Sequence, residues 1–130
     1  MLVASTFMTL IEIVAGAATL DSRTGLEHHS IAMLLLGVAV LPMALGALRG
    51  ARPAMAALAA LGVVVLVVSF TVDLPAALDE GLYGERYEGA EAQPAAGFYV
   101  ESLAGAFLLV SGGLLLMVGG GRPGALADAP

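Results

Sequence analysis

The chain has 130 residues, of which 59% are hydrophobic and 12% charged, and its mean hydropathy is +0.95. Soluble domains carry roughly 25% charged residues, so this composition excludes an ordinary soluble core and indicates a membrane protein. Eleven acids and five basic residues give a formal net charge of −6, and without a basic run nucleic acid is not an expected partner. The lack of cysteine excludes disulfides and thiolate metal sites.

Four apolar stretches predict membrane-spanning helices. They are residues 1–20, 30–48, 53–72 and 98–120. The third is the clearest, because about twenty residues without a charge, at a rise of 1.5 Å each, match the roughly 30 Å hydrocarbon core of a bilayer. The sequence therefore predicts an all-α fold: an integral membrane four-helix up-down-up-down bundle, forming a single domain over residues 1–121.

The arginines predict the orientation of this bundle. Arg49 and Arg52 lie in the turn between the second and third stretches, and Arg122 follows the fourth. By the positive-inside rule this turn and both termini are expected in the cytoplasm, with the chain in the cell membrane. The first stretch is interpreted as a retained helix and not as a signal peptide, because it lacks a basic start and contains Glu12. The tail, residues 122–130, has no periodicity and is predicted to be disordered.

The first stretch carries a polar stripe if it is helical. Ser5, Thr9, Glu12 and Gly16 follow the helical spacing and would share one face. An ionised carboxylate inside a membrane costs at least about 2.5 kcal/mol, so Glu12 is expected to be paired or protonated. Three interpretations stay open for Glu12: a structural acid bonded to another helix, a proton or cation site in a carrier or channel, or a contact with a partner.

A short family resemblance surrounds the same glutamate. The seven residues LIEIVAG are similar to the first helix of the small multidrug-resistance transporters, in which such a glutamate exchanges protons for cationic substrates. The chain lacks tryptophan and has a much longer third connection than those transporters. The resemblance therefore assigns no family.

Glycines predict where helices pack. Gly105, Gly112 and Gly119 recur every seven residues in the fourth stretch, and small residues in membrane helices let a neighbouring backbone come close. Gly16 is given the same role in the first stretch. Glu101, near the outer end of the fourth stretch, is interpreted as an N-terminal charge favoured by the helix dipole, with a ligand role as the alternative.

Polar side chains gather in the two outer connections. His28 and His29 lie in the first, and Asp73 closes the third stretch, so they are expected to converge with Glu101 at one outer surface. The spacings H-x-x-x-H and H-E-x-x-H are absent, so the histidines are interpreted as part of a solvated loop, and no metal ion or cofactor is predicted. A short interfacial helix is predicted over residues 75–87.

The sequence favours a protein that is not an enzyme. It contains no nucleophile elbow and no phosphate loop. The run Gly119-Gly120-Gly121 follows a predicted helix and not a strand, so it is interpreted as a helix exit and not as a dinucleotide fingerprint. The favoured interpretation is a non-catalytic accessory, interaction or lipid-facing module whose partners are the bilayer and another membrane protein or a second copy. The alternative is a small proton- or cation-coupled carrier or channel that uses Glu12.

Overall fold

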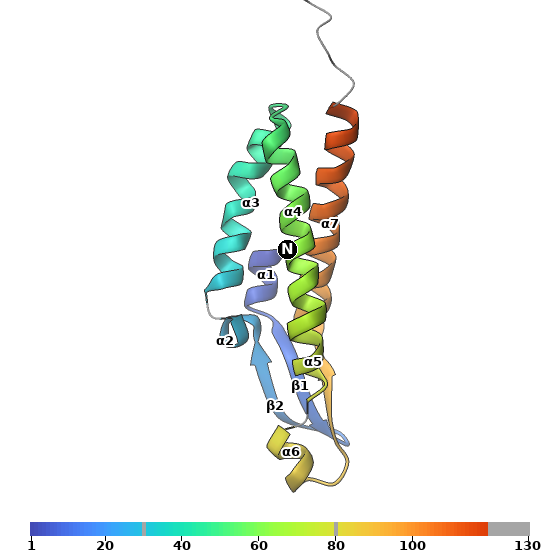
Figure 1. Cartoon of the computed structure of the whole chain (residues 1–130). Coiled ribbons are helices and arrows are strands. Elements are labelled where there is room, and N and C mark those ends of the chain that lie inside the picture. The colour runs from blue at the N-terminus through green and yellow to red at the C-terminus, as the bar shows by residue number, and fades with distance from the viewer. Residues whose placement is uncertain (30, 80, 120–130) are drawn as a thin grey trace, which may run out of the picture.

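The computed structural model describes residues 1–29, 31–79 and 81–119. Three long helices run along one another, and a small three-stranded antiparallel sheet lies beyond one end of them (Figure 1). The prediction of an all-α four-helix bundle is therefore wrong, because the fold is mixed α/β.

The difference arises in the first twenty residues. They form a short helix, α1 (Leu2–Thr6), then strand β1 (Thr9–Ala15) and the start of strand β2 (Ala18–Thr24), and they do not form a spanning helix. The β1 sequence TLIEIVA is rich in β-branched residues, and its burial alternates around Glu12, as in a half-buried strand. Gly16, at φ 61°, forms the hairpin turn between the two strands, so its predicted role in helix packing is also wrong.

The sheet has the strand order β2-β1-β3, and both pairings are antiparallel. The third strand, β3 (Ala90–Pro94), pairs with β1 and leads directly into the last helix. A small apolar cluster holds the sheet against the helices and consists of Leu10, Ile11, Ala77 and Phe98. Two short helices flank the sheet, α2 (Gly25–His29) and α6 (Gly81–Arg86).

The three long helices are the largest elements of the fold. They are α3 (Ala32–Leu48), α4 (Arg52–Val68) and α7 (Ala96–Gly119). The π-helical segment η1 (Ser69–Asp73) and the short helix α5 (Leu74–Ala77) extend α4 toward the sheet. Two continuous helical segments, Arg52–Ala77 and Ala96–Gly119, are long and apolar enough to cross a membrane, whereas α3 is shorter. They cover the third and fourth predicted stretches.

Glycines bring the backbones of α4 and α7 together. A Cβ added at Gly62 would lie 2.6 Å from the carbonyl oxygen of Gly105, and one added at Gly112 would lie 2.5 Å from the backbone nitrogen of Ala59. The packing at Gly119 is less tight, since an added Cβ would meet only the Met55 side chain, at 3.5 Å. Close backbone approach of this kind is characteristic of small-residue seams between membrane helices.

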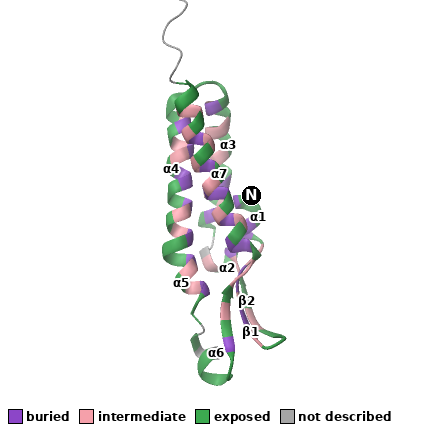
Figure 2. Cartoon of the chain, turned by 90° about the vertical axis from the view of Figure 1, so that its right-hand side faces the viewer, coloured by how far each residue is buried: buried purple, intermediate pink, exposed green. Residues whose placement is uncertain are grey.

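Many residues of the three helices are exposed (Figure 2), and large apolar residues are among them. The exposed ones are Leu35, Val38, Leu41, Leu45, Leu48, Val63, Val64, Val67, Phe70, Val72, Leu103, Phe107, Val110, Leu114, Met117 and Val118. Monomeric soluble proteins rarely expose contiguous apolar patches larger than a few hundred Å². The outer surface of α3, α4 and α7 is therefore suited to contact with lipid or with another protein.

Candidate functional site

A buried polar cluster lies where the long helices meet the sheet. Its members are His28 of α2, Ser69 and Asp73 of η1, and Glu101 of α7. Ser69 and Asp73 have no exposed surface, and Glu101 is 1% exposed. Buried carboxylates are rare and costly unless they are paired or hydrogen-bonded, which makes this junction cluster the candidate functional site.

Two contacts define the geometry of the junction cluster. The imidazole Nε2 of His28 lies 3.3 Å from Oδ1 of Asp73, and the His28 side chain is 18% exposed. The hydroxyl of Ser69 donates a hydrogen bond of 3.2 Å to Oε1 of Glu101. The cluster thus joins α2, η1 and α7, three elements that are distant in sequence.

The π-helical turn brings Ser69 and Asp73 to the cluster. The backbone N–H of Leu74 donates to the carbonyl oxygen of Ser69, five residues earlier, so this turn is wider than an α-helical one. Single π-helical turns inside α-helices occur frequently at functional sites. Here the turn directs two polar side chains inward at the end of an otherwise apolar helix.

A hydrogen-bonded turn at the start of α2 positions His28. The backbone N–H and the hydroxyl of Thr24 donate to Oε2 of Glu27 at 2.8 and 3.0 Å. The Thr24 backbone N–H is the main cause, and the Thr24 hydroxyl the second, of a pKa of Glu27 that lies below its ordinary value. Gly25 allows the close packing, because a Cβ there would lie 3.0 Å from the carbonyl oxygen of Ser5 in α1.

The cluster combines an imidazole–carboxyl contact, between His28 and Asp73, with a hydroxyl–carboxyl hydrogen bond, between Ser69 and Glu101. Its two carboxyl groups come from different helices, and an imidazole and a hydroxyl accompany them. Such groups can hold or pass a proton. Within the described residues no group of three or more His, Cys, Asp or Glu side chains is arranged to hold a metal ion.

The structure separates the other predicted site residues. Glu12 lies half-buried on β1, where the hydroxyl of Thr19 on β2 donates a 2.8 Å hydrogen bond to its carboxylate. Thr9 begins β1, and Ser5 is buried in α1, where its hydroxyl donates to the Leu2 carbonyl at 2.8 Å. The predicted helical stripe of Ser5, Thr9 and Glu12 is therefore wrong, because Ser5 lies in α1 whereas Thr9 and Glu12 lie in strand β1.

The remaining predicted residues lie close to or within the cluster. His28, Asp73 and Glu101 belong to it, whereas the side chain of His29 lies outside the described residues. Sequence reasoning missed Ser69, although Ser69 stands four residues before Asp73 on the same helix and could share its face. The expected disordered tail also lies outside the described residues.

Comparison with known proteins assigns no family to the chain. No protein-family model, curated protein or solved structure matches it. The fold and the site alone define its class: three apolar helices with an apolar outer surface, a small sheet at one end, and a buried acidic cluster between the two.

Proposed function

We propose that the protein is a membrane-embedded, non-catalytic accessory module. In this proposal α3, α4 and α7 cross the bilayer, and the sheet with α2 and α6 forms a head outside it. The head is the surface offered to another membrane protein. The proposal replaces the predicted four spans with three, because the first twenty residues form α1, β1 and the start of β2 and contain no spanning helix.

The exposure of the helices carries this proposal. In the most apolar windows of Arg52–Ala77 and Ala96–Gly119, only 28% and 22% of the residues are buried. The core helix of a soluble protein is apolar because it is buried, whereas a membrane helix is apolar where it faces lipid. Apolar helices with mostly unburied surfaces therefore favour the bilayer as their surroundings.

The positions of the charged residues along the long helices agree with the proposed placement in the bilayer. Asp73 and Glu101 lie near the sheet end of the helices, and Arg49 and Arg52 lie at the other end. The 17 residues of α3 span roughly 26 Å at 1.5 Å per residue, close to the lower limit for crossing a bilayer. The positive-inside rule then favours a cytoplasmic Arg49–Arg52 turn and a head on the opposite side.

Cysteine accessibility tests the placement, and the natural chain contains no cysteine that would interfere. In whole cells, a cysteine introduced by Ala51→Cys is expected to be shielded from an impermeant thiol reagent. One introduced by Gly84→Cys, on exposed α6, is expected to react. Equal reaction at both positions would contradict a membrane between the turn and the head, and the reverse pattern would contradict the orientation.

A proton- or cation-handling role at the junction cluster is the second candidate. Ionisable groups buried at membrane depth are functional-site candidates by default, and this cluster holds two buried carboxyl groups, one of them in contact with an imidazole. The closed glycine seam between α4 and α7 favours the accessory role, because backbones in contact leave no path between these helices.

Flux into liposomes separates the two candidates. An accessory module is expected to give no proton or cation flux above that of empty liposomes, for wild type and for Glu101→Gln alike. The glutamine keeps an acceptor for the Ser69 hydroxyl, so the variant should fold. Flux in the wild type that disappears in Glu101→Gln would overturn the accessory role and establish transport.

A further inference from the structure

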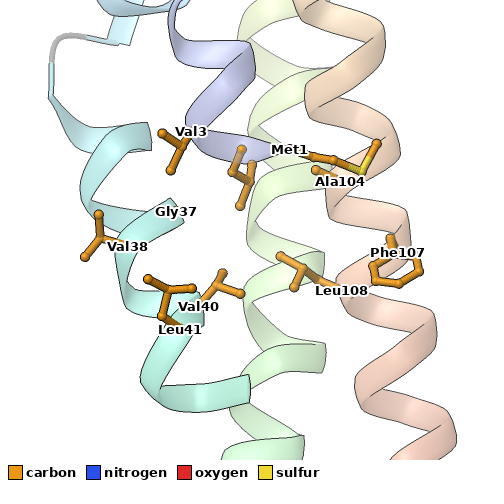
Figure 3. Close-up of a pocket in the computed structure, with 10 residues that line it drawn as sticks. Met1, Val3, Gly37, Val38, Val40, Leu41, Ala104, Phe107 and Leu108 are labelled. Atoms are coloured by element: carbon orange, nitrogen blue, oxygen red, sulfur yellow. The ribbon is translucent and has the colours of Figure 1, made fainter. Parts of the chain in front are cut away.

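An apolar pocket of about 340 Å³ opens between α1, α3 and α7 (Figure 3). Its walls include Leu2, Val3, Val38, Leu41, Ala104 and Phe107. Among the described residues that line the pocket, none has a charged side chain. Its occupant must therefore be apolar over the length that it buries.

Helix α1 closes the pocket on the side of the sheet. A Cβ added at Gly37 would lie 2.8 Å from the Val3 side chain, so α1 packs tightly on α3. Leu2 is 5% exposed and belongs to the apolar core of the long helices. The turn between α3 and α4 lies at the far end of α3 from the sheet, on the other side of the pocket from α1 (Figure 1).

The dimensions exclude a helix as the occupant. A helix about 10 Å across would fit less than one turn into 340 Å³. A spanning helix of a second copy would also collide with α1, which occupies the sheet-side half of the space between α3 and α7 (Figure 1). Gly37 lies twelve residues from Arg49, or roughly 18 Å along α3, which is about half of a 30 Å hydrocarbon core. This length corresponds to one acyl chain of one leaflet.

The open end of this path carries positive charge. Arg49 and Arg52 are exposed in the turn, and within the described part of the chain neither forms an ion pair. Guanidinium groups bind phosphate oxygens through paired hydrogen bonds. On the basis of the proposed membrane placement, we propose that the pocket between α1, α3 and α7 holds an acyl chain of an anionic phospholipid whose phosphate contacts Arg49 and Arg52.

Photolabelling of the protein in lipid nanodiscs tests the proposal. The probe is phosphatidylglycerol with a photoactivatable diazirine near the end of one acyl chain, and labelled residues are located by mass spectrometry. Leu41 and Phe107 are expected to be labelled several-fold more than Val64. Val64 is the reference outside the pocket. It is 48% exposed, and it lies twelve residues from Arg52, the same distance along its helix as Gly37 from Arg49.

Two matched variants test the pocket itself. Leu41→Trp fills it, whereas Leu35→Trp enlarges an equally exposed leucine of α3 outside the lining. Labelling of Phe107 is expected to fall about tenfold in Leu41→Trp, the change expected if roughly two methylene groups lose their contact. It should stay unchanged in Leu35→Trp. The double variant Arg49→Gln and Arg52→Gln should lose the preference for the anionic probe over a phosphatidylcholine probe.

The outcomes separate this proposal from the proposed function. Equal labelling of Leu41, Phe107 and Val64 would overturn the lipid site and leave the membrane placement standing. Labelling of Val64 without labelling of the pocket would show that a protein covers it, which also overturns the lipid site. No labelling at any of the three positions would contradict the membrane placement as well.

Discussion

Gly112→Ala is expected to be less stable than Gly113→Ala by about 1–3 kcal/mol, the usual cost of extra volume in a packed interface. A Cβ at Gly112 would lie 2.5 Å from the backbone nitrogen of Ala59 and 2.8 Å from the carbonyl oxygen of Met55. Both atoms belong to the backbone of α4, so no side-chain rotation relieves the contact. A Cβ at Gly113 meets nothing within 4 Å.

The adjacent pair is a matched comparison. Both substitutions occur inside α7, so both gain the same helix propensity, about 1 kcal/mol for glycine to alanine. Gly113→Ala should therefore equal or exceed the wild type in stability. Thermal unfolding of the purified variants in detergent gives the comparison. Equal midpoints for the two variants would contradict the close approach of α4 and α7 at Gly112.

The long uncharged helices could be predicted from the sequence, because an apolar stretch forms a helix through contacts among its own residues. The segments around 53–72 and 98–120 form continuous apolar helices in the structure, and a helix needs only its own residues to satisfy its backbone. Pro53 lies in the first turn of α4, where its missing N–H costs nothing.

The first twenty residues could not be recognised in the same way. Polar positions in this stretch fit a helical stripe, and the alternation of Ile11, Glu12 and Ile13 fits a strand equally well. The strand is stabilised by pairing with β3, and the partner of Ile13 is Ala92, far along the chain. Strand propensity depends on such neighbours, so the outcome is decided by tertiary contacts.

The junction cluster could be predicted only in part from the sequence, for a related reason. The polar residues near the ends of the apolar stretches suggested that His28, Asp73 and Glu101 lie at one level, since each borders an apolar stretch. The role of Ser69 depends on a π-helical turn, which has no signature in the sequence of an apolar helix. Contact distances inside the cluster depend on how α2 packs, and α2 contacts α3, β2, α1 and β1.

Asp73→Ala is expected to lower the free energy of unfolding by about 3 kcal/mol, the lower end of the cost of breaking a buried pair. The substitution removes the carboxylate that lies 3.3 Å from His28, and Asp73 has no exposed surface. Asp21→Ala is the control, because Asp21 pairs with Arg23 at 3.8 Å on the exposed face of the hairpin. An exposed pair contributes about 0–1 kcal/mol, so this control should unfold nearly like the wild type.

A double-mutant cycle tests whether the stability lost in Asp73→Ala comes from the contact between Asp73 and His28. If Asp73 acts through His28, the variant with both Asp73→Ala and His28→Ala should lose less stability than the sum of the single losses, by at least about 0.5 kcal/mol. Additive losses would contradict the ion pair. Because His28 belongs to α2 of the head and Asp73 to the extension of α4, a coupling energy between them links the head to the long helices. The head and the helices should then unfold in one transition in the wild type, and the Asp73→Ala variant should lose the head at a lower temperature than the helices.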